Sequence, residues 1–189
     1  MSLDSSVTAI TADQNVAGES ALGDLIADAQ RESVDADFAV MNPGGIRTNL
    51  DAGPITWGEL FGVQPFGNTV VRLTATGQDI YDLLEQQWTA QSSPRMLQIS
   101  GFEYTWRSSA PVGNRIVVVS KDGIPIERTA NYTIAVNSFL ADGGDGFTVL
   151  ARGHDPVVGP IDLDALTNHI QRRAQPISVV VSGRILRVE

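Results

Sequence analysis

Apolar residues recur at helical spacing in three separate stretches of the chain. The stretches begin near Glu19, Thr76 and Asp162. In each, apolar residues lie three or four positions apart, which would place them on one face of a helix. These positions are Leu22, Leu25, Ile26 and Ala29, then Ile80, Leu83, Leu84 and Trp88, then Leu163, Leu166 and Ile170. The pattern predicts three amphipathic helices, the last capped by Asp162 and ended by Pro176.

Short apolar or alternating runs between these stretches predict β-strands. The expected strands are 38–41, 69–74, 97–100, 102–106, 115–120, 132–136, 147–150 and 183–188. Thr56 and Glu59 have the spacing of a capping box, which predicts a further short helix. Helices and strands intermix without a βαβ rhythm. We therefore predict an α+β fold, a single domain with a mixed β-sheet and flanking helices.

The chain length fits one domain with a full hydrophobic core. It has 189 residues, which is short for two domains. We expect residues 1–7 to be a leader or a disordered start and residues 8–189 to form the domain. The start has neither a basic region nor an apolar region of a secretory signal, which suggests a domain taken from a longer protein. No apolar run approaches the roughly 20 residues of a membrane span.

Net charge and cysteine content exclude some classes of binding partner and some kinds of chemistry. The formal net charge of −9 would repel nucleic acids and anionic membranes, so we expect neither as a partner. The chain contains no cysteine, which excludes disulfides and thiolate chemistry and fits an extracytoplasmic bacterial protein.

Motifs for catalysis and metal binding are missing. The two histidines, His154 and His169, belong to no metal-binding pattern, and we expect His169 on the surface of its helix. The chain has no Gly-x-Ser-x-Gly elbow, no phosphate-binding Gly-Lys-Ser/Thr loop and no dinucleotide fingerprint. We therefore predict no catalytic residue, no metal site and no cofactor within this chain.

A glycine-rich segment, 137–147, is the strongest candidate for a binding loop. It reads Asn-Ser-Phe-Leu-Ala-Asp-Gly-Gly-Asp-Gly-Phe and follows a predicted strand. Three glycines favour positive φ angles and close approach of the backbone to a neighbour. Phe139 and Asp145 could then hold a flat ring joined to a polyol. The alternative is a strand connection with Phe139 in the core.

Two further glycine-containing loops carry complementary groups. Residues 42–47, Asn-Pro-Gly-Gly-Ile-Arg, could form an anion-binding nest, with Arg47 gripping oxygen atoms. The alternative is an ordinary turn with a solvated Arg47. Residues 64–68, Gln-Pro-Phe-Gly-Asn, place Phe66 in a turn, where it could equally fill the core.

Convergence of the three loops would make a base-binding site. Phe66 and Phe139 could sandwich a planar base, with each stack worth about 1–3 kcal/mol. Asn42 or Asn68 could bond the base edge, and Asp145 could accept hydrogen bonds from ribose.

Four segments in this order resemble the C-terminal domain of the 5'-nucleotidase family. They are Glu19-Ser-Ala-Leu-Gly-Asp-Leu25, Asn42-Pro-Gly-Gly-Ile-Arg47, Pro65-Phe-Gly-Asn68 and Asn137-Ser-Phe-Leu-Ala-Asp-Gly-Gly-Asp-Gly-Phe147. The family includes ecto-5'-nucleotidases, periplasmic UDP-sugar hydrolases and 2',3'-cyclic-nucleotide phosphodiesterases. The resemblance extends from about Thr8 to Val188.

The resemblance implies that this chain recognises the base and ribose of a nucleotide or nucleoside. Catalysis would belong to a separate N-terminal metallophosphoesterase domain with two divalent metal ions. The full protein would hydrolyse nucleoside phosphates outside the bacterial cytoplasm, and the isolated chain would be inactive. The implied substrate-binding residues are Phe66 and Phe139 for stacking, Asn42 and Asn68 for the base edge, Asp145 and Arg47 for ribose and phosphate, and Gly101 near the base.

One departure from the family pattern keeps two alternatives open. Family members commonly carry an arginine shortly before the Glu-x-x-Leu-Gly segment, and Thr11–Gly18 contains none, with Ala12 near that place. The chain could therefore be a non-catalytic interaction module of the same fold. It could also belong to a related hydrolase with another substrate, such as a sulfur-carrier hydrolase.

Overall fold

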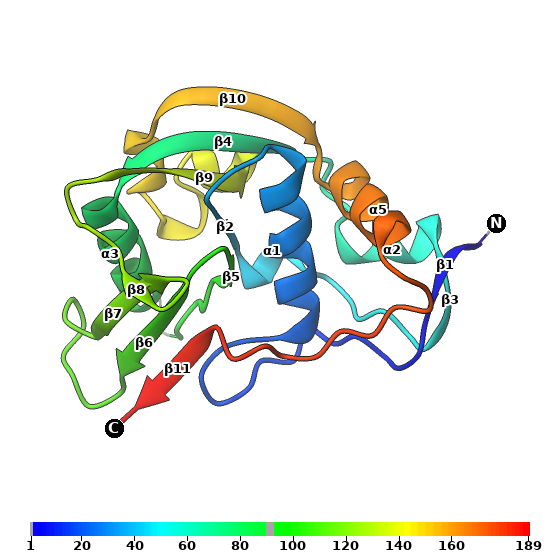
Figure 1. Ribbon diagram of the computed structural model, residues 1–189, viewed down its shortest axis with the longest axis horizontal. Helices are drawn as coiled ribbons and strands as arrows, with labels where there is room; N and C mark the ends of the chain where they lie inside the picture. The colour runs from blue at the N-terminus through cyan, green and yellow to red at the C-terminus, as the bar shows by residue number, and fades with distance from the viewer. Residues whose placement is uncertain (1, 90–92) are drawn as a thin grey trace.

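The protein folds into three β-sheets with helices packed around the largest (Figure 1). The computed structural model describes residues 2–89 and 93–189. The strands are β1 (Ser2–Ser6), β2 (Phe38–Met41), β3 (Gly53–Thr56), β4 (Thr69–Thr76), β5 (Gln98–Ser100), β6 (Glu103–Arg107), β7 (Ile116–Lys121), β8 (Ile124–Pro125), β9 (Asn131–Asn137), β10 (His154–Ile161) and β11 (Ile185–Val188). The α-helices are α1 (Ala21–Ser33), α2 (Trp57–Val63), α3 (Gly77–Glu85), α4 (Ser138–Ala141) and α5 (Asp162–Arg172). Short 3-10 helices are η1 (Pro43–Gly45), η2 (Gln86–Trp88), η3 (Gly144–Gly146) and η4 (Leu150–Arg152).

Two of the sheets are mixed. The five-stranded sheet has the order β10-β4-β9-β2-β5, with β2 parallel to β9 and the other pairs antiparallel. The four-stranded sheet has the order β11-β6-β7-β8, with β11 parallel to β6. Strands β1 and β3 form a separate antiparallel pair. The predicted α+β class is confirmed, although its strands form three sheets where one was expected.

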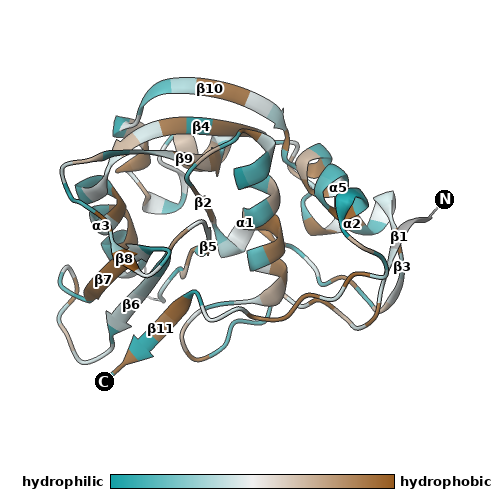
Figure 2. Ribbon diagram, in the orientation of Figure 1, coloured by the Kyte–Doolittle hydropathy of each residue, from teal (hydrophilic) through white to brown (hydrophobic). Residues whose placement is uncertain are grey.

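Strand β2, which lies between β9 and β5, is buried on both faces. Phe38 and Val40 belong to the main hydrophobic core, which includes α3 and the four-stranded sheet. The alternate residues Ala39 and Met41 pack on the opposite face, where α1 and α5 lie. Alternation follows from strand geometry, because successive side chains point to opposite faces. Figure 2 shows both hydrophobic and hydrophilic residues on α1, as expected for a helix with one buried side.

The predicted helix starts are confirmed for the two capping boxes. The Thr56 hydroxyl accepts a hydrogen bond from the Glu59 N–H, and the Glu59 carboxylate accepts one from the Thr56 N–H. Thr76 and Asp79 make the same reciprocal pair at the start of α3. Helix α5 begins at Asp162 itself, so this residue lies one position inside the helix and Ile161 occupies the cap position.

Four expectations about local structure are wrong. Residues 154–161, which are not among the expected strands, form the edge strand β10. Residues 147–150, expected to be a strand, form a turn that leads into η4. Ser2–Ser6, expected to belong to a leader or a disordered start, pair with β3. His169 is buried, and its Nδ1 lies 2.8 Å from Glu32 Oε2.

Three buried or partly buried acidic side chains, from α1 and the segment just before it, hold the C-terminal segment. Glu19 accepts hydrogen bonds from the backbone N–H groups of Arg184 and Ile185, at 2.9 and 3.2 Å. The Arg184 guanidinium donates to both carboxylate oxygens of Asp28, at 2.7 and 2.9 Å. Asp24 accepts from the Ser182 hydroxyl at 3.0 Å. These contacts bring β11 to the edge of the four-stranded sheet.

Within the described residues, none of the helices has the length and apolar character needed to cross a bilayer.

Asp24 predicts a pH-dependent stability. Burial raises the pKa of Asp24 to about 7, and Arg184 only partly opposes this. An unfolded aspartate has a pKa near 3.9, so between pH 5 and 7 the folded state keeps a proton that the unfolded state has lost. The wild-type free energy of unfolding, relative to Asp24→Asn, should fall as pH rises through this window, by at most about 1.4 kcal/mol per pH unit. Urea unfolding measures it. An Asp24→Asn difference that is equal at pH 5 and 7 contradicts the prediction.

Gly101 predicts a packing constraint at the turn after β5. Its φ is +84°, and an added Cβ would lie 2.0 Å from the backbone oxygen of Asp37. Gly123 has a similar φ of +76° but open space around the same position. Gly123→Ala should cost about 1–2 kcal/mol for the backbone conformation alone. Gly101→Ala should cost about 1–3 kcal/mol more, because a clash is added. Equal losses in urea unfolding would rule out the clash.

Candidate functional site

Three asparagines meet at one edge of the five-stranded sheet. Asn42 follows β2, and Asn137 is the last residue of β9. Because β2 and β9 run parallel, their carboxyl ends lie side by side. Asn68 precedes β4, whose Val70 pairs with Asn137 in the antiparallel register. Strand pairing therefore brings together residues that are far apart in the sequence.

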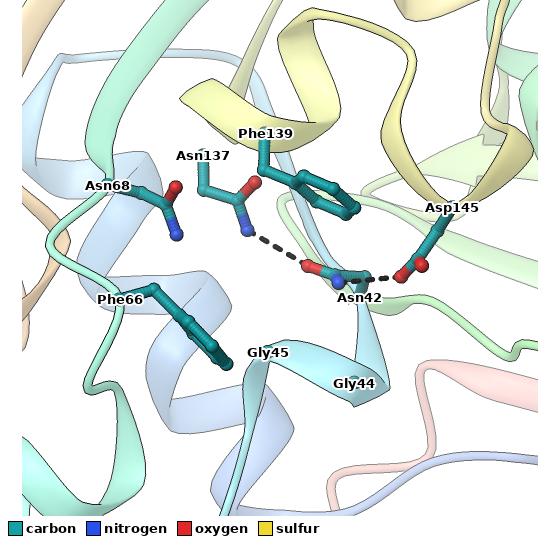
Figure 3. A pocket seen from close by; sticks show the side chains of 8 residues that line it. All are labelled: Asn42, Gly44, Gly45, Phe66, Asn68, Asn137, Phe139 and Asp145. Carbon is teal, nitrogen blue, oxygen red and sulfur yellow. Dashed lines mark hydrogen bonds between the residues drawn. The ribbon is translucent and has the colours of Figure 1, made fainter.

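Two exposed phenylalanines stand over this edge on opposite sides of a pocket. Phe66 lies between α2 and β4, and Phe139 lies on α4; their relative exposures are 57% and 46%. The pocket has a volume of about 220 Å³. It is lined by Asn42, Gly44, Gly45, Phe66, Asn68, Asn137, Phe139 and Asp145. Figure 3 shows the ends of the Asn42 and Asn137 side chains near the space between the two rings, with Asn68 to one side of them. Neither phenylalanine fills the core, so that alternative is wrong for both.

A chain of side-chain hydrogen bonds forms the polar part of the pocket. Asn137 Nδ2 donates to Asn42 Oδ1 at 2.9 Å, and Asn42 Nδ2 donates to Asp145 Oδ2 at 2.8 Å. Asn137 Oδ1 accepts from the Leu140 N–H at 2.8 Å and so caps α4. The chain links the ends of β2 and β9 with the glycine-rich turn, and it fixes the orientation of both amides (Figure 3).

The glycine-rich turn places Phe139 and Asp145 on the same side. A Cβ added to Gly144 would lie 2.5 Å from ring atom Cε1 of Phe139, so only glycine allows the turn to fold against this ring. Asp145 itself has a φ of +57°, a left-handed conformation that aspartate tolerates better than most residues. The segment is thus a turn that presents a ring and a carboxylate, as its composition indicated.

Asn68 joins the pocket to the start of α5. Its backbone oxygen accepts from the Asp162 N–H at 2.8 Å, and its Oδ1 accepts from the Ser138 hydroxyl at 3.3 Å. Burial raises the pKa of Asp162 above its ordinary value, although hydrogen bonds from Leu163 and Asn68 oppose the rise. Asn68 is therefore held from two sides.

Two of the expected site residues lie outside the pocket lining. Arg47 is exposed at its rim, and its Nη1 donates to the backbone oxygen of Gly44 at 3.2 Å. Gly101 is at the opposite end of the sheet, because Ser100 pairs with Ala39 near the start of β2, whereas Asn42 follows its end. Gly101 lines a separate charged hollow with Asp37 and Lys121. The expectation of Gly101 near a base in this pocket is therefore wrong.

The sequence reasoning missed one residue that lines the pocket, Asn137, and one that contacts a lining residue, Arg95. Asn137 stands just before the Ser-Phe pair, and asparagine there is a recognisable helix cap. Arg95 has no such signal: its Nη1 donates to Asp145 Oδ1, a contact between segments 50 residues apart. Among the described residues, no group of three or more His, Cys, Asp or Glu side chains could hold a metal ion.

The arrangement suits recognition of a flat ring carrying a hydroxylated substituent. Aromatic faces on two sides can stack on a ring, amides can bond its edge, and a carboxylate can accept hydrogen bonds from hydroxyl groups.

Comparison with known proteins identifies the family. Residues 3–152 match the family model described as 5'-nucleotidase, C-terminal domain. The chain belongs to this family. The relationship explains why the four sequence segments occur in order, and the resemblance drawn from them is confirmed.

Individual relatives differ in their stated roles. The 5'-nucleotidase C-terminal domain described here is 39% identical over 174 residues to endonuclease YhcR of Bacillus subtilis (strain 168), covering 91% of this chain and 14% of that protein. It is 36% identical over 180 residues to cell wall protein Lmo0130 of Listeria monocytogenes serovar 1/2a (strain ATCC BAA-679 / EGD-e), covering 88% of this chain and 23% of that protein.

A solved structure confirms the fold. The crystal structure of a 5'-nucleotidase precursor from Thermus thermophilus matches with a TM-score of 0.89 and 32% identity, over 100% of this chain and 39% of that one. In each of these three comparisons, the domain spans well under half of the related protein.

The hydrogen-bond chain predicts that Asn42 stabilises the domain. In Asn42→Ala, the amide of Asn137 and the carboxylate of Asp145 each lose a partner, which should cost about 1–3 kcal/mol. Urea unfolding with the exposed Asn168→Ala as control measures this, and the control should change by less than about 0.5 kcal/mol. Equal stability of the two variants would show that these hydrogen bonds make no net contribution to the free energy of unfolding.

Proposed function

We propose that this domain recognises the base and ribose of a nucleotide for a metal-dependent, 5'-nucleotidase-type hydrolase. The hydrolase would convert nucleoside phosphates to nucleosides and phosphate. This chain would bind and orient the substrate and would be inactive alone, because positioning a substrate does not supply the attacking group.

The observation that carries the proposal is the pair of exposed rings on opposite sides of one pocket. Large apolar side chains are normally buried, so two half-exposed phenylalanines around a hollow indicate a binding site. Phe66 projects from the turn before β4, and Phe139 projects from the short helix α4, which directly follows β9. The volume of about 220 Å³ is below the roughly 300–1,000 Å³ of pockets that enclose whole drug-sized ligands, so it suits a single base better than a whole nucleotide.

Polar groups supply the remaining recognition. The amides of Asn42 and Asn68 are near the rings and offer donors and acceptors for the base edge. Asp145 would accept from ribose hydroxyls, and Arg47, at the rim, would face ribose and phosphate. A bound nucleotide would thus lie with its base between the rings and its phosphate directed outward.

Catalysis would require another part of a longer protein. We place two divalent metal ions in an N-terminal metallophosphoesterase domain, which would supply an activated water as the nucleophile. The relatives are several times longer than this chain, which leaves room for such a domain. A cell wall relative and the absence of cysteine both support an extracytoplasmic location.

A second candidate arises from the endonuclease relative. A longer protein of that kind would act on a polynucleotide, and this domain would then bind one nucleotide of the chain. The net charge of −9 disfavours a polyanion, and the pocket is sized for one base. We therefore favour a mononucleotide or nucleoside as the ligand.

The ring pair predicts the effect of removing either aromatic side chain. Phe66→Ala and Phe139→Ala should each weaken adenosine binding by roughly ten- to a hundredfold, because each loses one stacking face. Chemical-shift perturbation in NMR titrations of the chain with adenosine gives the dissociation constants.

A matched control exists on the neighbouring helix. Phe61 of α2 is 45% exposed, stacks on Trp57 and does not line the pocket. Phe61→Ala should leave adenosine affinity unchanged. If wild type shows no perturbation near Phe66 and Phe139 at millimolar adenosine, the chain is a module without base recognition.

A further inference from the structure

The carboxylate of Asp145 is held from two directions before any ligand binds. Asn42 Nδ2 donates to Oδ2 at 2.8 Å, and Arg95 Nη1 donates to Oδ1. The Asp145 side chain is 18% exposed and that of Arg95 is 29% exposed, so the pair is partly shielded from water. Charge-assisted hydrogen bonds in such surroundings are stronger than those at an open surface. Asp145 therefore has a defined orientation in the pocket.

Arg95 is itself held by well-fixed backbone. Its N–H donates to the backbone oxygen of Gln87 at 2.8 Å, and two residues later the Leu97 N–H donates to Gln87 Oε1 at 2.7 Å. Gln87 is buried, and its Nε2 donates to the Leu84 oxygen at 2.9 Å at the end of α3. The guanidinium thus reaches Asp145 from a segment tied to the main core, and little ordering is left to occur on ligand binding.

Two acceptor positions of the carboxylate remain after these contacts. An ionised carboxylate has about four lone-pair sites on its two oxygens, and Asn42 and Arg95 use one on each oxygen. One free position on each oxygen matches the two neighbouring hydroxyls of a vicinal diol. Arg95 also balances the charge of Asp145, the only acidic residue among those that line the pocket in the described structure, so that the pair suits a neutral diol.

We propose that Arg95 is a positioning residue that orients Asp145 to accept both hydroxyls of a ribose, and so makes this site select ribose over a sugar that lacks the vicinal diol. This inference rests on the proposed nucleoside-binding function. It adds a residue from outside the three glycine-containing loops, and it assigns that residue to sugar selectivity, whereas the rings determine stacking on the base.

The test compares two ligands that differ only in the sugar hydroxyls. Dissociation constants for adenosine and 2',3'-dideoxyadenosine are measured by NMR titration for wild type, Arg95→Met, Arg95→Lys, Asp145→Ala and the Arg95→Met/Asp145→Ala double variant. Arg152→Met serves as control, because Arg152 is exposed and does not line the pocket. Wild type should prefer adenosine by at least roughly tenfold, because the dideoxy ligand loses two hydrogen bonds to a charged group.

Arg95→Met should bring this preference close to one by weakening adenosine binding while dideoxyadenosine binding stays the same. Asp145→Ala should also bring the preference close to one. The double variant should lose no more adenosine affinity than either single variant, because both substitutions act through the same carboxylate. Arg95→Lys, which keeps a cationic donor, should retain part of the preference, and Arg152→Met all of it.

Two other results overturn the inference and differ from each other. If Arg95→Met or Arg95→Lys lowers the affinity for both ligands by the same factor, Arg95 has only a structural role, and the proposed recognition of the base still holds. If wild type binds neither ligand, the proposed function fails and this inference fails with it.

Discussion

The parallel pairing of β2 with β9 is the contact on which the rest of the site depends. Phe38 lies opposite Ile134 and Ala39 opposite Ala135, and this register places Asn42 and Asn137 within hydrogen-bond distance. Both strands are buried on two faces, so a slip by one residue would turn apolar side chains away from their own core. The core thus sets the register, and the register sets the pocket. The register of the two strands is enough to place Asn42 and Asn137 next to each other.

Polar contacts in this domain hold a loop and the C-terminal strand in place beside the hydrophobic core. Asn42 and Asp145 tie the glycine-rich turn to the sheet, and Glu19 and Asp28 tie the C-terminal strand to the α1 region. In both places, a partly or fully buried carboxylate accepts from two or more donors. Buried polar groups are tolerated when they are paired in this way, and here the pairing positions loops and termini.

Much of the fold follows from local sequence rules, and some does not. Helices α1, α3 and α5 have clear apolar stripes, and Thr56 and Thr76 mark helix starts. Strand β10 contains Pro156 and Pro160 and reads as a loop, but proline is tolerated in an edge strand, whose outer side needs no partner.

The pocket was also predicted only in part. Phe66, Phe139, Asn42, Asn68 and Asp145 stand in recognisable loops, and three loops at strand ends are a fair basis for expecting convergence. Arg95 could not be found this way, because its role arises from a contact with Asp145 across 50 residues. Gly101 was wrongly predicted to be a site residue. A glycine is needed there because the backbone oxygen of Asp37 lies too close for a side chain. The sequence alone does not distinguish this packing requirement from a close approach to a ligand.

The pocket walls come from strand ends that only the assembled sheet brings together. A ligand that binds there has almost no affinity for the unfolded chain, so it adds its binding free energy to the stability of the whole domain. Opening of β2 from β9 would remove the site at once, and ligand should slow amide hydrogen exchange in these central strands as well as in the loops it touches. Ligand binding in the pocket would therefore be detectable far from it, as slower amide hydrogen exchange in the strands of the sheet.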